Sequence, residues 1–284
     1  MVDNKENIFF SSNPKDIKFL KTIVDESYSE GNAGNKFIVF YSINGILYLI
    51  YSHSYSIIIF NLLSEKKINE IKDAHACYIS SFNHYLDKNN NRDLIISISA
   101  DNNNLKLWNL NNLECLANIK KLNKSGFLNA ACFLNQNNHI YILTSNLRIS
   151  GNCEPIKVYD LNGYIIKDIK DSRNATLYMD SFYDKKFSKN FIITANVGFL
   201  NSFDFEENKK YKIYESNESD KNYKFIIDNS EEIIKLIHSN SKGAIRIWDF
   251  HTGNLLKIIH TDEMALFGIC LWNNKYLFVG GKKK

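Results

Sequence analysis

Leu105-Lys-Leu-Trp-Asn-Leu110, followed by Asn111-Asn-Leu-Glu-Cys-Leu-Ala-Asn-Ile119, is the stretch of the chain that decides the fold. Apolar and polar residues alternate in its first half, which predicts a short strand with one buried face. A tight polar turn and a second strand follow. The same pattern returns at Ile245-Arg-Ile-Trp-Asp-Phe250 and in the next segment, His251–Ile259. The chain therefore contains an internal repeat built from pairs of strands.

Three weaker copies of the first strand give the repeat its period. They lie at Ile57–Leu62, Ile156–Leu161 and Leu200–Phe205. One aromatic residue of each copy serves as a marker, and the steps between markers are 48, 51, 44 and 45 residues. The five markers are Phe60, Trp108, Tyr159, Phe203 and Trp248. A repeat of about 40–45 residues with four strands is typical of β-propeller blades.

The composition agrees with an all-β domain. Of the 284 residues, 44% are hydrophobic and 13% are aromatic, and aromatic and β-branched side chains favour the pleated, half-buried surface of a sheet. No run of about 18 apolar residues occurs, so we expect no membrane span. The N-terminal segment Met1–Asn7 is charged and lacks the apolar core of a signal peptide.

Charge and cysteine content limit the classes of partner. The formal net charge is +4, and the lysines and few arginines form no cluster, so a nucleic-acid partner is not expected. The five cysteines include no Cys-x-x-Cys pair, which argues against a zinc site or a redox pair. Reduced cysteines fit a cytoplasmic protein, with the nucleus as the alternative location.

Alternation predicts five repeats of four strands each. The first two repeats comprise Phe37–Tyr41, Ile46–Tyr51, Ile57–Leu62 and Lys67–Ile71, then Tyr78–His84, Leu94–Ser99, Leu105–Leu110 and Cys115–Ile119. The third and fourth comprise Phe127–Leu134, Ile140–Thr144, Ile156–Leu161 and Tyr164–Ile169, then Leu177–Tyr183, Phe191–Ala195, Leu200–Phe205 and Tyr211–Tyr214. The fifth comprises Tyr223–Ile227, Ile233–His238, Ile245–Phe250 and Leu255–Ile259.

The remaining strands lie at the two ends of the chain. Two are predicted at Ile8–Phe10 and Ile17–Ile23, and two at Ala265–Trp272 and Tyr276–Gly280. Residues 1–284 are therefore expected to form a single domain of about six blades, in which the termini pair and close the ring, because closure removes exposed edge strands. The alternative is a truncated seven-bladed propeller, because Val279–Lys282 ends where a Gly-Gly-x-Asp turn would continue.

The second repeat resembles the WD40 repeat family, and the resemblance extends over nearly the whole chain. His75 stands at the histidine of the family's Gly-His pair, Ser97 and Asp101 lie within its Ser-x-Asp turn segment, and Trp108-Asn109 stands at its Trp-Asp pair. The resemblance implies that His75, Ser97, Asp101 and Trp108 form a buried, hydrogen-bonded tetrad that braces the blade.

The other repeats depart from this pattern. The fifth has Lys242 where the family has the aspartate of the turn. The third and fourth have Tyr159 and Phe203 in place of tryptophan, and neither side chain carries an indole N–H. Most blades are therefore expected to depend on apolar packing rather than on a tetrad.

Catalytic and metal-binding constellations are not expected. His75 beside Asp101 could form a catalytic pair, but both residues fall at scaffold positions of the family, which favours the structural role. His251, His260 and the pairs Glu206-Glu207 and Glu231-Glu232 are interpreted as solvated. No phosphate-binding loop, nucleophile elbow or zinc-protease motif occurs. Asp180 is the one acid in a predicted first strand, and we therefore expect neither an enzyme nor a cofactor.

A partner-binding surface is predicted where the innermost strands begin. In WD40 propellers these entrances surround the top of the central channel, and alignment places Tyr78, Phe127, Tyr178, Tyr223 and Met264 there. Exposed aromatic groups often anchor partners, although the same residues could instead fill the channel. The loop predicted at Ser145–Pro155 is longer than its counterparts and adds Arg148 to this surface.

These observations favour a non-catalytic protein–protein interaction scaffold. Such a protein would hold other proteins or peptides, whose identity no motif reveals, and would act as a monomer within a larger complex. The alternative is a propeller that binds RNA or another anionic partner such as a modified histone tail. Salt dependence separates the two, because nucleic-acid affinity falls steeply as salt rises.

Overall fold

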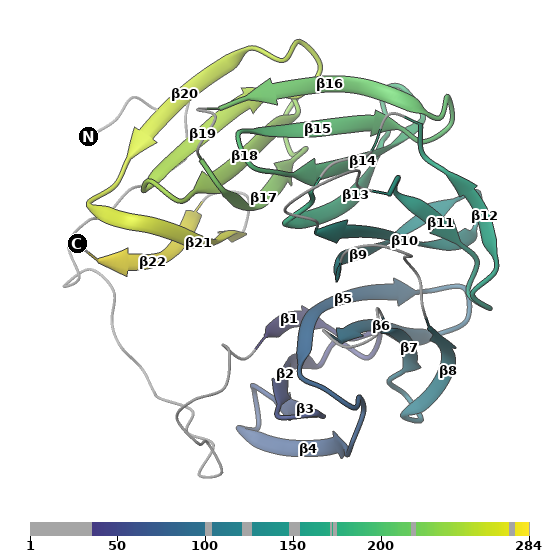
Figure 1. Ribbon diagram of the computed structural model, residues 1–284. Helices are drawn as coiled ribbons and strands as arrows, with labels where there is room; N and C mark the ends of the chain where they lie inside the picture. The colour runs from purple at the N-terminus through teal and green to yellow at the C-terminus, as the bar shows by residue number, and fades with distance from the viewer. Residues whose placement is uncertain are drawn as a thin grey trace. The chain divides into compact units, whose positions relative to one another are not determined.

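The described part of the chain is built from strands alone. The computed structural model describes residues 36–99, 104–120, 127–147, 154–170, 172, 175–216, 220–272 and 276–283, and these contain no α-helix. They form five four-stranded sheets and one two-stranded sheet (Figure 1). Each strand pairs with its neighbours in sequence. This arrangement matches a WD40 propeller of about six blades.

The strands of the first two sheets follow in chain order. They are β1 Phe37–Tyr41, β2 Leu47–His53, β3 Ser56–Asn61, β4 Lys66–Ile71, β5 Ile79–Asp87, β6 Arg92–Ser99, β7 Asn104–Asn109 and β8 Glu114–Ile119. The third and fourth sheets comprise β9 Phe127–Gln136, β10 His139–Leu147, β11 Lys157–Tyr159, β12 Ile165–Asp168, β13 Tyr178–Asp184, β14 Lys189–Ala195, β15 Phe199–Asp204 and β16 Lys209–Glu215. The fifth and sixth comprise β17 Asn222–Asp228, β18 Lys235–Asn240, β19 Ala244–Asp249, β20 Leu255–His260, β21 Glu263–Trp272 and β22 Tyr276–Lys283.

The five repeats of four strands are confirmed, with boundaries that differ from the predicted ones by at most three residues. The predicted start of the long loop at Ser145 is wrong. β10 continues to Leu147, and Ser145 and Asn146 pair with Ala130 and Leu128 of β9 across a register shift. Both polar residues are buried, so the end of apolar alternation did not mark the end of the strand. The strands predicted before residue 24 lie outside the described residues.

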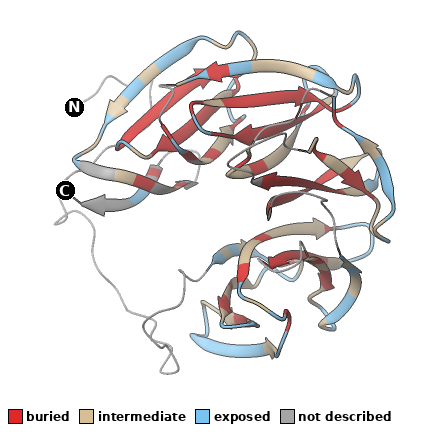
Figure 2. Cartoon of the chain, viewed as in Figure 1, coloured by how far each residue is buried: buried red, intermediate tan, exposed pale blue. Residues whose placement is uncertain are grey.

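Burial follows the position of each strand within its sheet. β6, β14 and β18 are buried along nearly their whole length, because both of their faces are covered and their sequences are almost continuously apolar or small. The last strands β4, β12 and β20 are largely exposed (Figure 2).

The described residues divide into two compact units. One contains residues 36–193 and 203–210, and the other contains residues 194–202 and 211–283. In the first unit, Ile50 and Ile59 pack against Ile79 and Ile95 of the second sheet. In the second unit, the apolar core of the fifth sheet continues onto β21 and β22 through Leu266, Ile269 and Leu277.

Candidate functional site

Three of the four expected tetrad residues lie together in the second sheet. The hydroxyl oxygen of Ser97 lies 2.7 Å from Nε2 of His75 and accepts a hydrogen bond from the indole N–H of Trp108 at 2.8 Å. All three side chains are buried. These contacts attach the segment before β5 to both β6 and β7. Asp101 lies outside the described residues.

In the third and fourth sheets the aromatic residue at the tryptophan position is surrounded mainly by apolar side chains. Tyr159 is buried in the core that joins the second and third sheets, and burial raises the pKa of its hydroxyl to about 12. Phe203 is buried beside Met179 and Ile192. Both aromatic rings stand at the tryptophan position of their repeats, as the sequence indicated.

The fifth sheet carries a polar network at the same register positions as the tetrad. Trp248 pairs with Leu236 as Trp108 pairs with Ile95, so the two tryptophans are equivalent. Two residues earlier, Arg246 pairs with His238, whereas Lys106 pairs with Ser97. Histidine therefore occupies the place of the tetrad serine. Lys242 follows it in the turn between β18 and β19, where Asp101 stands in the second repeat.

Asp220, just before β17, is the centre of this network. Its carboxylate is fully buried and accepts a hydrogen bond from Nδ2 of Asn240 at 2.7 Å. One oxygen lies 3.3 Å from the guanidinium of Arg246, and the other lies 3.0 Å from the ammonium of Lys242. A buried carboxylate requires such partners, because its desolvation is otherwise strongly unfavourable.

The acidic and basic residues of this network have exchanged positions relative to the tetrad expected for the second sheet. There the base, His75, precedes the first strand and the expected acid, Asp101, lies in the turn. In the fifth sheet the acid, Asp220, precedes the first strand and the base, Lys242, lies in the turn. The fifth repeat, which lacks the aspartate of the turn, therefore has a polar network of its own. We call Asp220, Asn240, Lys242 and Arg246 the inverted brace.

His238 gives the fifth sheet a defined response to pH. Its ring is fully buried, stacks on Trp248 and lies near Arg246. Burial, together with the charge of Arg246, lowers the pKa of His238 to about 3. The folded protein therefore keeps this imidazole neutral, whereas the unfolded chain takes up a proton below about pH 6.5. Stability is fully present above that pH and is lost progressively as the pH falls toward 3.

The contribution of His238 can be measured from unfolding by urea at pH 7.5 and pH 5.0. The wild-type protein is expected to lose about 2 kcal/mol more between these pH values than the variant His238→Gln, whose side chain does not titrate. His84, whose pKa is also lowered by burial, contributes equally to both proteins. Equal pH dependence of the two proteins would contradict the assignment.

The predicted partner-binding residues differ in exposure, and the structure describes the side chains of only two of them. Tyr78, immediately before β5, has 49% of its surface exposed. Tyr178, at the start of β13, is half-buried and its hydroxyl donates to Oδ2 of Asp180 at 3.4 Å. Burial, together with the charge of Asp180, raises the pKa of this hydroxyl. The side chains of Phe127, Tyr223 and Met264, and the whole of Arg148, lie outside the described residues.

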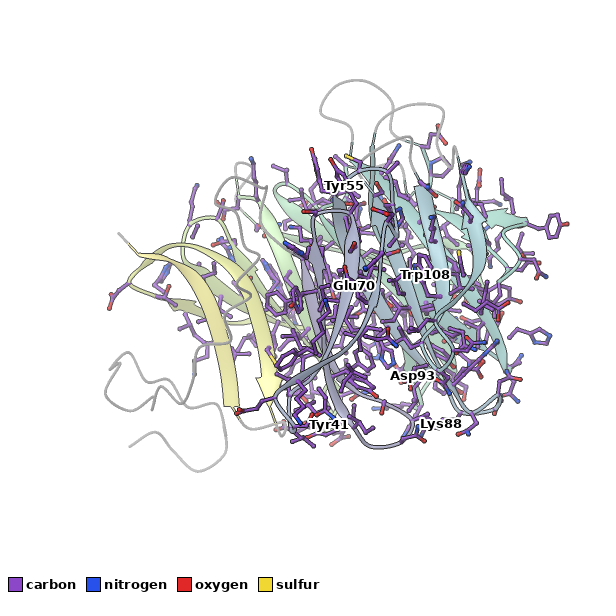
Figure 3. The ribbon with its side chains drawn as sticks, turned by 90° about the horizontal axis from the view of Figure 1, so that it is seen from below. Tyr41, Tyr55, Glu70, Lys88, Asp93 and Trp108 are labelled. Atoms are coloured by element: carbon purple, nitrogen blue, oxygen red, sulfur yellow. The ribbon has the colours of Figure 1, made fainter. Side chains whose placement is uncertain are left out.

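Tyr55 joins Tyr78 at the same end of the first two sheets. It lies in the turn between β2 and β3, has 48% of its surface exposed, and accepts a hydrogen bond at its backbone carbonyl from the amide of His75 at 3.1 Å. Figure 3 shows Tyr55 at the opposite end of these sheets from Tyr41 and Lys88. Tyr55 was not predicted as a site residue, because among the turns between second and third strands only the loop at Ser145–Pro155 stood out by its length.

The segment that carries Tyr78 is held at several points. Lys106 donates to the carbonyl of Ala74 at 2.6 Å, and the Ser99 hydroxyl donates to that of Cys77 at 3.5 Å. The amide of Asp73 donates to the Ser56 hydroxyl at 3.3 Å. Together with His75, these contacts attach residues 72–78 to both neighbouring sheets. We call Lys36, Ser54, Tyr55 and residues 72–78 the tyrosine surface.

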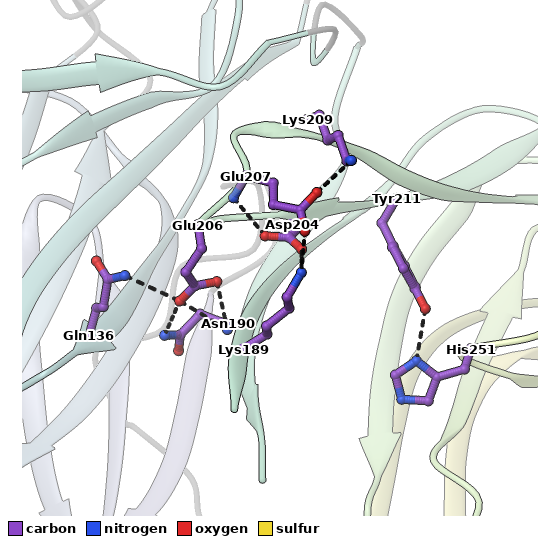
Figure 4. Close-up of polar contacts among 9 residues, drawn as sticks. All are labelled: Gln136, Lys189, Asn190, Asp204, Glu206, Glu207, Lys209, Tyr211 and His251. Carbon is purple, nitrogen blue, oxygen red and sulfur yellow. Dashed lines mark hydrogen bonds and ion pairs between the residues drawn. The ribbon is translucent and has the colours of Figure 1, made fainter. Parts of the chain in front are cut away.

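The glutamate pair predicted as a solvated surface is exposed but also paired. Glu206 accepts from the amide and the side chain of Asn190, and Glu207 forms ion pairs with Lys189 and Lys209 (Figure 4). Hydrogen bonds from Lys189 and Lys209 lower the pKa of Glu207 to about 2. The site is open to solvent, so these pairs contribute little to stability.

His251 is not simply solvated, in contrast to its interpretation from the sequence. In the second compact unit its Nδ1 lies 3.0 Å from the hydroxyl of Tyr211 (Figure 4), and its ring packs edge-on against Phe250. His260 is exposed. These contacts join the outer strand β16 to the turn after β19.

Within the ranges that the structure covers, no three His, Cys, Asp or Glu side chains are grouped to hold a metal ion. No helix in those ranges has the length and apolarity needed to cross a membrane.

The comparisons with known proteins agree with this architecture. No family model matches the chain. It is 28% identical over 216 residues to a BTB/POZ domain and WD-repeat protein of Acanthamoeba polyphaga mimivirus, covering 72% of this chain and 39% of that protein. Its fold is similar to the WD40 β-propeller domain of Doa1, with a TM-score of 0.63, 18% identity, and coverage of 83% of this chain and 72% of the other. The chain therefore has a WD40-type β-propeller fold, and its sequence is similar to that of a WD-repeat protein.

Proposed function

We propose that the protein is a non-catalytic scaffold that binds other proteins through the tyrosine surface. The observation that carries this proposal is the exposure of two tyrosine rings, Tyr55 and Tyr78, on backbone segments held by buried contacts. WD40 propellers generally bind other proteins, which supports the general role of a protein-binding scaffold. The fold by itself does not decide function, so the choice of surface rests on these side chains.

Rigid tyrosines are suitable anchors for a partner. A tyrosine ring offers a large apolar area with few rotatable bonds, and its hydroxyl can hydrogen-bond at the edge of the contact. The surrounding backbone is already ordered by His75, Ser99 and Lys106. Binding therefore costs little conformational entropy in this part of the protein.

The other predicted residues extend the proposal. Tyr178 and the loop that follows Leu147, with Arg148, are proposed as a second contact region. Support for this comes from the partial exposure of Tyr178 at the start of β13. Loops on a rigid scaffold are common places for specificity.

The variant Tyr55→Ala/Tyr78→Ala tests the tyrosine surface. We expect recovery of the native partner from cell extracts by the tagged full chain to fall at least tenfold, because an anchor tyrosine typically contributes about 2 kcal/mol or more. The melting temperature should change little, because both rings are half-exposed. Recovery is measured by quantitative mass spectrometry.

The control for this experiment is Tyr164→Ala. Tyr164 is 71% exposed and lies beside the outer strand β12, so this variant also removes an exposed tyrosine. We expect it to recover the partner as well as the wild-type protein does. Equal recovery by the double variant and the control would move the binding surface elsewhere.

A further inference from the structure

The tyrosine surface carries an excess of positive charge. Lys36 and Lys72 are exposed on it, and Lys106 brings its ammonium group to the carbonyl of Ala74 beneath it. Asp73 is the one acidic residue of the surface as defined above. Among the described residues, two exposed lysines and the ammonium of Lys106 beneath them thus accompany one carboxylate of the surface.

The nearest acid on the adjoining strand offsets only part of this charge. Glu70 of β4 forms an ion pair with Lys67 at 2.7 Å. The hydrogen bond from Lys67, helped by the charges of Lys67 and Lys72, lowers the pKa of Glu70, so the carboxylate is ionised and paired. Glu70 thus neutralises Lys67 and compensates part of the charge of Lys72, which still leaves a net positive charge among the described residues of this area.

The position of Lys106 fixes part of the positive charge in place. Its ammonium lies 5.5 Å from the centre of the Trp108 ring as well as 2.6 Å from the carbonyl of Ala74. Carbonyl oxygens and the faces of aromatic rings both attract a cation. Trp108 is itself fixed by its bond to Ser97. The ammonium group of Lys106 is therefore held in a defined position beneath the tyrosine surface.

We infer that the segment bound by the tyrosine surface is an acidic peptide stretch of a partner protein, with an apolar or aromatic side chain that packs on Tyr55 and Tyr78. Carboxylates of such a segment are attracted by Lys36 and Lys72, and complementary charge mainly speeds association and selects the partner. This inference rests on the proposed function, because it names the chemistry of the partner for the same surface.

The chemistry of the surface favours a peptide over RNA. The tyrosine surface contains no arginine, the side chain best suited to grip phosphate in two places. Base recognition by stacking commonly uses several aromatic rings along a groove that follows a charged backbone. Two tyrosines on separate turns with three lysines fit a short acidic segment with one apolar anchor.

Selection from a library of random 12-residue peptides displayed on yeast tests the inference directly. The bait is the folded full chain. We expect the enriched peptides to have a net negative charge and at least one aromatic or large apolar residue. A peptide from this pool should bind about tenfold more weakly to Lys36→Glu/Lys72→Glu, because each reversal replaces an attraction by a repulsion.

Two control variants separate the local effect from the total charge. Lys88→Glu/Lys185→Glu changes the net charge by the same amount, and it should change the affinity less than twofold. Figure 3 shows Lys88 at the opposite end of the sheets from Tyr55, and Lys185 is exposed in the corresponding turn between the first two strands of the fourth sheet, β13 and β14. Tyr55→Ala/Tyr78→Ala should abolish binding of the selected peptides. An equal loss in both lysine variants would show that the effect is not local and would overturn the inference.

The outcomes distinguish the inference from the proposed function. Peptides that depend on the two tyrosines but show no acidic bias would overturn the inference and leave the proposed function standing. Peptides that bind equally to Tyr55→Ala/Tyr78→Ala, or a selection without enrichment, would overturn both. If a fluorescent 20-nucleotide RNA bound the wild-type chain, lost binding on reversal of Lys36 and Lys72, and was not displaced by the selected peptides, RNA would replace the acidic peptide as the ligand.

Discussion

Asp220→Ala is expected to lower the free energy of unfolding by about 3–5 kcal/mol, because removal of one partner leaves buried charge uncompensated. The carboxylate of Asp220 is fully buried and is shared by Arg246, Lys242 and Asn240. Without it, the buried guanidinium of Arg246 loses its ion pair. Unfolding by urea, followed by circular dichroism, measures the change.

Two further variants give the Asp220 experiment its controls. Lys242 is 54% exposed, so Lys242→Ala should cost less than about 1 kcal/mol. The double variant Asp220→Ala/Arg246→Met should be more stable than Asp220→Ala, because it also removes the stranded charge. A single variant as stable as the wild-type protein would show that the inverted brace does not stabilise the fold.

Trp108→Ala is expected to cost about 3–5 kcal/mol, the usual range for truncation of a buried aromatic residue. The ring fills the core between the first two sheets beside Ile79 and Ile95. Its indole N–H also bonds to the Ser97 hydroxyl at 2.8 Å. The variant therefore loses packing and a buried hydrogen bond together. Thermal and urea unfolding both report the loss.

The variant Trp108→Phe separates these two contributions. It keeps an aromatic ring but has no donor for Ser97, so a cost of about 1–3 kcal/mol is expected from the lost hydrogen bond. If Trp108→Phe were as stable as the wild-type protein while Trp108→Ala was strongly destabilised, the residue would act by packing alone. A small effect of Trp108→Ala would contradict both roles.

The sheets could be predicted from the sequence because each repeat carries its own local signal. Stretches such as Leu105–Leu110 and Ile245–Phe250 share one short pattern, an aliphatic–basic–aliphatic run followed by Trp and Asn or Asp, and its return at a regular spacing marks the third strand of a repeat. Where apolar residues no longer recur, the sequence no longer predicts a strand. Ser145 and Asn146 are polar yet buried in β10, because their partners lie on β9 rather than nearby in the sequence.

The contacts of the candidate site were harder to predict. The pairing of His75 with Ser97 and Trp108 corresponds to positions of a known motif, so the resemblance was enough to propose it. The inverted brace matches no such motif. Asp220 meets Lys242 and Arg246 through the register of β17 with β18 and of β18 with β19. A comparison of the turn alone shows a lysine in place of aspartate and does not reveal the acid before the first strand.

The tyrosine surface shows a different limit of prediction. Tyr78 was found because it precedes a first strand, whereas Tyr55 belongs to the neighbouring repeat. The two come together because the amide of His75 donates to the carbonyl of Tyr55. Adjacent repeats contribute one residue each, and inspection of one repeat at a time does not reveal their proximity.

Because of the inverted brace, single segments cannot be exchanged freely between the repeats of this chain. A hybrid that carried the segment around His75 in front of the fifth sheet would place a histidine opposite Lys242 and Arg246, with no acid among them. A hybrid in the other direction would bring Asp220 to a sheet whose turn is expected to hold Asp101. The segment before the first strand and the turn before the third must therefore be inherited together, and shuffling or design of such propellers should exchange them as one block.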